Sequence, residues 1–536
     1  MPPTVLGSGP WKGVRTSNDP FDDTPDVLHD AVNCYLSDLT APSGLYARPG
    51  FVEATPTFSI TAGQASCLFT MTALDGTIYR FFMTNGKLYR LSGTNFGTAT
   101  DVTPVGVTIN ASATPTARFY MTAFADELIA HDSVNRPWRG TNLGSTPITG
   151  TYIDLDGAAG SWTAQGQPVV YDGALFFIAK TVPGGSSVEA GLGLVWSEPF
   201  QPDVGYVQTG YANFWNLVQQ STAPIYALWA TNAYLYYFRE YSIGAIAGAP
   251  NVNFQTAASA DVVSGSVGTK APASVCQFGD TIYFVDALGR PSSFTQTGPV
   301  RELWTQLAGI IDTTPALIAS PSATAQVGIG CIVPQLNTVL LGGWSSSAAA
   351  TPPLGPTTLY AFDAVTGTYF GRWIAGAASG LTTFDSLAQM KDSNGAPIIT
   401  AFSTGGATQH LYLQSLLSAN NWKDNAVTPT ISATTPRLGY SANVVWNATE
   451  TATIIQQSTA ALTVTVQTPY TSATTEATAM AAISSSDSTY RVVIGLDVLQ
   501  ARGMQFTMTA TTATSQWILQ RMEFVAQSSR AGIVDA

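Results

Sequence analysis

Short apolar strands separated by tight turns dominate the chain between about residues 65 and 415. In residues 67–93 the turns are Asp75-Gly76 and Asn85-Gly86, dipeptides that tolerate the positive φ angles of a hairpin. The same succession of strand, turn and aromatic-ended strand recurs in residues 117–140, 168–182, 225–246, 274–295, 328–374 and 384–413. The spacing of roughly 40 to 60 residues is close to the length of a four-stranded propeller blade.

These repeats predict an all-β protein whose main domain, residues 65–415, is a β-propeller. In residues 359–373, LYAFDAVTGTYFGRW, an apolar strand, an Asp turn and a Trp-terminated strand are able to present two faces to neighbouring blades. The spacing is irregular, so six and seven blades are both open. An array of β-sandwiches is the alternative interpretation.

The stretch 169–244 is unusually aromatic. Two apolar strand pairs flank a Pro- and Gly-broken loop, expected as an insertion around residues 180–222, that carries Trp196, Phe200, Tyr206, Tyr211, Phe214 and Trp215. Exposing such large aromatic side chains to water loses the free energy that their burial would contribute. We therefore expect Phe200, Tyr206, Tyr211, Phe214 and Trp215 to be largely buried, on the propeller or at a subunit interface.

The two ends of the chain differ from the repeats. Residues 1–64 are rich in Pro and are expected to be a loop-rich segment that docks on the body. Residues 416–536 are dense in Thr and β-branched residues and predict a separate antiparallel β-sandwich domain. Helix patterns are scarce, at residues 303–314 and 475–486.

Composition excludes some classes of protein. Of 536 residues only 10% are charged, and 22 Lys and Arg against 34 Asp and Glu give a net charge of −12. The chain has no clustered cations of the kind that bind nucleic acid. An acidic wall would repel a polyanion, which is consistent with exclusion of an acidic substrate or with DNA sliding past without sticking. A weakly charged surface fits contact with other subunits or, equally, a β-rich protein with Thr- and Ser-covered faces.

The cysteines and the N-terminal sequence bear on the compartment. Cys34, Cys67, Cys276 and Cys331 are widely spaced and predict buried free thiols in a reducing compartment. No signal peptide and no apolar run of membrane-spanning length are visible, so synthesis in a cytoplasm is expected.

Catalytic, cofactor-binding and metal-binding residues are not nominated. His29, His131 and His410 belong to no metal-ligand pattern. The pairs Asp22-Asp23, Asp154/Asp156 and Asp385/Asp392 lie at turn signals, which favour Asp for structural reasons. Residues 153–157, IDLDG, lack the further ligands of a Ca²⁺ loop, and Gly184-Gly185 and Gly342-Gly343 lack a nucleotide-binding context. We expect no enzymatic activity and no cofactor.

Residues 30–51 contain Asn33-Cys34-Tyr35 followed by Gly44-Leu45 and Arg48-Pro49-Gly50. This order resembles the N-x-Y … G-L-x-x-R-P-G signature of tail nozzle or hub proteins of short-tailed bacteriophages. The similarity extends to Trp196-Ser197-Glu198-Pro199, to Phe214-Trp215, to residues 235–243 and to the strand at 491–508.

The resemblance implies a virion tail protein made in the bacterial cytoplasm, whose residues 1–64 dock on the adaptor as well as on the body. Its copies, six in number, would form a ring below the portal and adaptor, through which the genome leaves without sequence-specific binding. Tail fibres or a plug protein would attach to this ring. Two other classes stay open: a receptor- or carbohydrate-binding propeller, which predicts exposed aromatics at repeated blade positions, and a propeller glycosidase, which needs two converging carboxylates.

Overall fold

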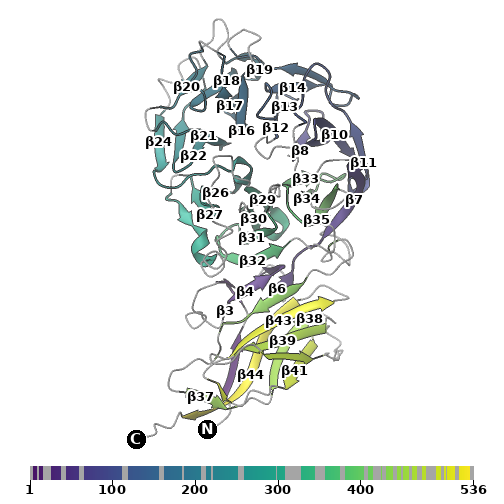
Figure 1. Ribbon diagram of the computed structural model, residues 1–536, viewed down its shortest axis with the longest axis vertical. Helices are drawn as coiled ribbons and strands as arrows, with labels where there is room; N and C mark the ends of the chain where they lie inside the picture. The colour runs from purple at the N-terminus through teal and green to yellow at the C-terminus, as the bar shows by residue number, and fades with distance from the viewer. Residues whose placement is uncertain are drawn as a thin grey trace.

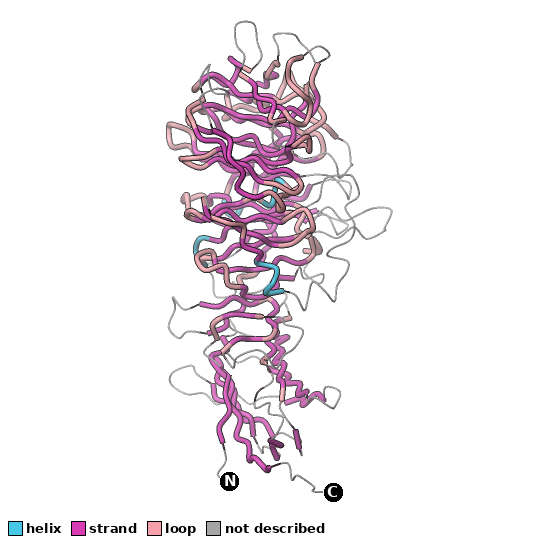
Figure 2. Tube along the Cα trace, turned by 90° about the vertical axis from the view of Figure 1, so that its left-hand side faces the viewer, coloured by secondary structure: helices cyan, strands magenta, loops and turns pink. Residues whose placement is uncertain are grey.

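The computed structural model shows an elongated all-β molecule with a ring of small sheets at one end and a β-sandwich at the other (Figures 1 and 2). Both termini lie at the sandwich end (Figure 1). The structure describes residues 4–530 except 9–10, 16–25, 38–43, 59–65, 112–118, 156–161, 184–185, 207–212, 219–220, 251–258, 297, 308–327, 344–355, 375–380, 404–408, 415–423, 425–429, 437, 439–443, 448–450, 458–460, 468–473, 479–489, 496–499, 502–503 and 513–517.

Seven groups of four or five antiparallel strands form the ring, six of them separate sheets and one part of a larger sheet. The predicted β-propeller is therefore confirmed and has seven blades in the described residues. Blades one to three are β8 (Ser66–Thr72), β9 (Ile78–Thr84), β10 (Lys87–Ser92), β11 (Thr98–Asp101); β12 (Tyr120–Phe124), β13 (Glu127–His131), β14 (Trp138–Thr141), β15 (Thr149–Tyr152); and β16 (Thr163–Tyr171), β17 (Ala174–Thr181), β18 (Gly193–Glu198), β19 (Gln201–Gly205), with β20 (Phe214–Asn216) also on β18.

Blades four to six are β21 (Ile225–Ala230), β22 (Leu235–Arg239), β23 (Ile243–Ala247), β24 (Ser259–Ser264); β25 (Cys276–Phe278), β26 (Thr281–Val285), β27 (Pro291–Thr295), β28 (Arg301–Glu302); and β29 (Ile329–Val333), β30 (Thr338–Gly342), β31 (Thr358–Asp363), β32 (Tyr369–Ile374). Short 3-10 turns are η1 (Thr94–Phe96), η2 (Pro272–Ser274), η3 (Leu303–Leu307) and η5 (Pro334–Leu336).

Blade seven closes the ring with strands from both ends of the propeller sequence. Its inner strands are β33 (Ser386–Lys391), β34 (Pro397–Ser403) and β35 (Gln409–Gln414), and its outermost strand is β7 (Phe51–Phe58). β7 pairs antiparallel with β35, with Val52 opposite Leu413. β33 in turn packs against β8 of blade one. The residues predicted as the N-terminal docking segment therefore supply a blade strand that holds the propeller closed.

The blades are buried on both faces because consecutive residues of a strand point to opposite sides. In β17, Phe176 and Ile178 join the hydrophobic cluster shared with blade four. Leu175, Phe177 and Ala179 join the cluster shared with blade two. The apolar runs of the sequence thus provide the contacts between blades.

The described part of the aromatic stretch is not an insertion loop, because it consists mainly of the outer strands of blade three: β18, β19 and β20. Tyr206 is fully buried, and its hydroxyl donates to Pro202 O at 2.8 Å. Phe214 and Trp215 are half-buried, and Tyr211 lies outside the described residues. Phe200 is 74% exposed, so its expected burial is wrong within this chain. Its backbone has a φ of 59° in the turn between β18 and β19, and its ring lies beside Gly173 in the turn between β16 and β17.

The sandwich consists of two sheets with a shared core, and it draws strands from both ends of the chain. One sheet contains β1 (Thr4–Ser8), β5 (Cys34–Ser37), β6 (Gly44–Ala47), β37 (Val444–Asn447), β38 (Thr451–Gln457), β41 (Tyr490–Gly495), β42 (Gln500–Ala501) and β44 (Ile518–Arg530). The other contains β4 (Asp30–Val32), β36 (Ile431–Thr434), β43 (Gln505–Thr512), β39 (Ala461–Gln467) and β40 (Thr474–Thr478). Leu519 and Met522 of the first sheet and Val464 and Phe506 of the second belong to one hydrophobic cluster.

The second sandwich sheet continues directly from blade six of the propeller. β4 pairs in parallel with β32 at Val32 and Arg372, and it pairs antiparallel with β36 on its other side. The same hydrophobic cluster runs from blade six into the sandwich. A two-stranded parallel piece of β2 (Gly13–Val14) and β3 (Val27–Leu28) lies beside this joint.

Two helix expectations differ from the structure. Residues 303–307 form only the 3-10 turn η3, and residues 308–314 lie outside the described part. The helix predicted at 475–486 is wrong for residues 475–478, because β40 (Thr474–Thr478) pairs with β39 across five residues. Residues 479–486 lie outside the described part. Thr-rich sequence favours strands once a neighbouring edge is available.

Candidate functional site

A cavity of about 420 Å³ lies at the centre of the propeller. Residues from six of the blades line it, together with the segment just before blade five that contains η2, and the first strands β8, β12, β16, β29 and β33 lie toward the centre of the ring (Figure 1). Its wall combines aromatic side chains such as Phe69, Tyr120 and Trp229 with the polar Thr122 and Gln167. The volume is in the range of small-molecule pockets. The cavity is therefore the first candidate for binding.

Asp385 is the carboxylate in this wall, and it is 1% exposed. Asp392, its suggested partner, lies at the other end of β33 in a hairpin turn, where its Oδ1 accepts the N–H groups of Asn394 and Ala396 at 2.8 Å. Six strand residues separate two positions by roughly 20 Å. The two carboxylates therefore do not converge as an acid/base pair.

The other proposed carboxylates serve structure or lie outside the described residues. Asp154 forms an ion pair with Arg136 at 2.5 Å, and Asp22, Asp23 and Asp156 are outside. Gly184-Gly185 are outside as well, whereas Gly342 ends β30. Within the described residues no group of three or more His, Cys, Asp or Glu side chains is placed to hold a metal ion.

The histidines lie apart from one another. His131 is buried, with Nε2 2.8 Å from Gly166 O, and Nδ1 accepts the N–H of Ser133 at 3.2 Å. Burial lowers the pKa of His131 to about 4, so it is a neutral structural residue at pH 7. His29 donates its backbone N–H to Thr434 O, and His410 lies in β35.

All four cysteines are free thiols, and Cys34, Cys276 and Cys331 are buried while Cys67 is half-buried on the cavity wall. Burial raises the pKa of the Cys331 thiol to about 12, and it raises the pKa of Cys276 well above the usual value. Both thiols are protonated and inert at neutral pH.

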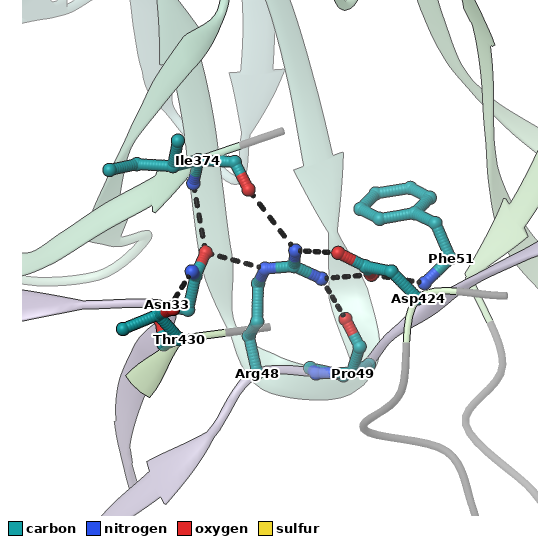
Figure 3. A network of polar contacts seen from close by, with 7 residues as sticks. All are labelled: Asn33, Arg48, Pro49, Phe51, Ile374, Asp424 and Thr430. Carbon is teal, nitrogen blue, oxygen red and sulfur yellow. Dashed lines mark hydrogen bonds and ion pairs between the residues drawn. The ribbon is translucent and has the colours of Figure 1, made fainter. Parts of the chain in front are cut away.

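A second constellation lies where the propeller meets the sandwich (Figure 3). Arg48, in the link between β6 and β7, is fully buried and forms a bidentate ion pair with Asp424, at 2.8 Å to Oδ1 and 2.5 Å to Oδ2. Its Nε donates to Asn33 Oδ1 at 2.9 Å, and its Nη groups also donate to Pro49 O and Ile374 O. We call Asn33, Arg48 and Asp424 the clamp.

Asn33 extends the clamp to both bodies. Its Oδ1 also accepts the N–H of Ile374 in β32 at 2.9 Å, and its Nδ2 donates to Thr430 O at 2.8 Å, next to β36. The backbone of Asn33 has a φ of 56°, a left-handed conformation that Asn tolerates better than most residues. Asp424 accepts the N–H of Phe51, the first residue of β7, at 2.9 Å. The clamp therefore ties the ring-closing strand, blade six and the sandwich together.

The sequence pattern pointed to two of the three clamp residues without their role. Asn33 and Arg48 are the polar members of the N-x-Y … G-L-x-x-R-P-G pattern, and the structure brings them together. Tyr35 of this pattern stacks on Tyr46, with ring centroids 5.5 Å apart. Asp424 was missed, because it stands 376 residues from Arg48 and no local pattern marks it.

No helix in the described part of the chain combines the length and apolarity needed to cross a membrane.

Comparisons with known proteins give no family. No protein-family model and no curated protein matches the chain. BamB from Moraxella catarrhalis is 12% identical over 71% of this chain and 96% of its own, with a TM-score of 0.37. BBS1N in complex with ARL6DN is 8% identical over 69% and 99%, with a TM-score of 0.41, and the designed Ika8 protein is 8% identical over 67% and 99%, with a TM-score of 0.34. Likeness at this level carries no argument, and the propeller follows from its own sheet topology.

Proposed function

We propose that the chain is a structural subunit of the tail of a short-tailed bacteriophage. Copies would form a ring, six in number by the resemblance, below the portal and adaptor. This ring would be the conduit for DNA and the platform for fibres or a plug. The observation that carries the proposal is the clamp: the residues on which the resemblance rests, Asn33 and Arg48, have a defined architectural task at the joint of two domains.

The build of the molecule supports an architectural role. The propeller is closed by β7, and blade six runs on into the sandwich through β4. A buried bidentate ion pair fixes the same joint. An elongated body with a stiffened joint suits a subunit that holds a fixed position in an assembly.

Exposure of the aromatics favours this role over a carbohydrate-binding propeller. Among the described residues, Phe200 and Tyr241 are the exposed aromatic side chains, at 74% and 52%. They belong to blades three and four and occupy different turns, so no aromatic position repeats from blade to blade. A glycosidase is disfavoured by the separation of Asp385 from Asp392 along β33.

The conduit would lie between copies and not within one propeller. A cavity of about 420 Å³ has the size of a small-molecule pocket, too small for duplex DNA. A net charge of −12 with 22 cationic residues fits a wall that does not retain DNA.

The test is the mass of the purified chain in solution, measured alone and with the portal and adaptor proteins of the same genome. We expect a closed ring to form, at the latest when the adaptor is present. A chain that stays monomeric under both conditions would refute the proposal. Phe200→Ser, on the exposed turn of blade three, tests whether that side chain lies at the subunit contact, with Thr98→Ser, on the exposed outer strand of blade one, as a control.

A further inference from the structure

A second pocket, of about 280 Å³, lies at one end of blade four. It is formed by the end of β22, the start of β23, the strand β24 and the segment that precedes β21. Ser221, Arg239, Tyr241, Ser242 and Val262 are among its lining residues. No part of the proposed assembly function uses this pocket.

Arg239 is the unusual member, because its side chain is buried without a counter-ion. It is 1% exposed, and no ion pair to it occurs among the described residues. Its Nη1 donates to Ser221 O at 2.6 Å, and its Nη2 donates to Leu217 O. Its Nε is buried and has no hydrogen-bond partner. A guanidinium has five N–H donors, so most of its capacity is unused.

The neighbouring charges do not neutralise Arg239. Glu240 is engaged by Lys270 at 2.8 Å, and its oxygen also accepts from the Tyr241 hydroxyl. Asp261, on β24, acts electrostatically on Tyr237. Burial lowers the pKa of Arg239, and the electrostatic effect of the Tyr237 phenol raises it. An arginine remains charged in proteins, so a buried positive charge without an anion lies at the wall of an open pocket.

We propose that this pocket binds a small carboxylate ligand, up to a monosaccharide acid in size, through Arg239. The planar fork of a guanidinium matches a carboxylate in two parallel hydrogen bonds. Ser242, at the same wall, supplies a hydroxyl group for the rest of the ligand, and the Tyr241 oxygen, whose proton is donated to Glu240, is left as an acceptor. The volume lies at the lower limit of ligand pockets, which restricts the ligand to this size. The site is independent of whether the chain builds a tail.

The test places a carboxylate in the pocket by substitution. Val262 lines the pocket and is 57% exposed, so we expect Val262→Asp and the uncharged, equally sized Val262→Asn to fold, which circular dichroism checks. Glucuronate and acetate are titrated into the full chain by calorimetry at constant ionic strength, with glucose as the neutral match of glucuronate. We expect glucuronate to bind and glucose not to bind. Val262→Asp should weaken glucuronate binding at least ten-fold, and Val262→Asn should stay within about two-fold of the unsubstituted chain.

The contrary outcomes are equally definite. Absence of carboxylate binding, equal binding of glucose, or equal affinities in Val262→Asp and Val262→Asn would each overturn the proposal. Binding of inorganic phosphate without binding of either carboxylate would show that the ligand class is wrong. Arg239→Lys, which keeps the charge and removes the fork, should lose glucuronate affinity even where its fold, followed by circular dichroism, is unchanged.

Discussion

Removing one charge from the clamp should destabilise the joint between propeller and sandwich severely. Asp424→Ala leaves the guanidinium of Arg48 in a fully buried site, where Asn33, Pro49 and Ile374 supply neutral acceptors only. Breaking a buried pair in this way costs about 3–5 kcal/mol. The N–H of Phe51 loses its acceptor as well, which adds about 1–3 kcal/mol if it stays buried.

The double variant Arg48→Met with Asp424→Leu separates charge from packing. The single variants Arg48→Met and Asp424→Leu each leave one buried charge unpaired, whereas the double variant leaves none. The cost of the double variant should therefore be smaller than the sum of these two single costs by at least about 2 kcal/mol. The exposed pair Lys87–Asp101, at 2.8 Å, is the matched control. Lys87 is the partner to change, because Asp101 also accepts from Thr103, and Lys87→Ala should cost no more than about 1 kcal/mol.

Two measurements follow the effect. Urea unfolding gives the loss in free energy, and hydrogen exchange of peptides covering residues 44–54 and 371–374 locates it at the joint. A cost below about 1 kcal/mol for Asp424→Ala would refute the reasoning. Strict additivity of the two single variants would do the same.

Three further perturbations test other parts of the fold. Gly371→Ala should lower the free energy of unfolding by about 1–3 kcal/mol in thermal unfolding, because φ is +127° and a Cβ would lie 2.6 Å from Ala31 O of β4. Gly395→Ala, at φ +83° but with its nearest neighbour at 3.5 Å, should cost less, and equal costs would contradict a tight contact at Gly371. The pKa of His131 is about 4 in the folded protein and about 6.5 in an unfolded chain, so the unfolded chain binds more protons between pH 4 and 6.5. The free energy of unfolding should therefore fall by up to about 1.4 kcal/mol per pH unit as the pH is lowered from 6.5 to 4. Urea unfolding at several pH values should show that His131→Gln loses this dependence. If a protease site is inserted between Phe58 and Ser66 and cut, the two fragments should stay together on size exclusion, because β7 is paired with β35; their separation would contradict the closure of the ring. Deletion of residues 1–65 should instead cause aggregation, because it exposes the edge of β35.

Local patterns predicted the blades well because each hairpin is specified by its own residues. Asp75-Gly76 and Asn85-Gly86 are turns, and Gly76 and Gly86 have the positive φ that the dipeptides indicated. The number of blades could not be predicted, because β7 and β35 are more than 350 residues apart and no local pattern in either strand indicates that they pair. Asp424 likewise stands 376 residues from Arg48, so no local pattern marks it.

Burial of single side chains was less predictable than the strands. The aromatic content of residues 180–222 indicated packing, and Tyr206 is buried as expected. Phe200 is exposed because two-residue turns such as that between β18 and β19 place one side chain outside the sheet.

The most direct measurement is the copy number of the chain in purified virus particles from the genome that encodes it. Quantitative mass spectrometry against the portal protein should find the chain in every particle at six copies, and electron cryo-microscopy should place it in a ring below the portal. Absence of the chain from particles, or its presence as scattered single copies outside the tail, would contradict the proposed role.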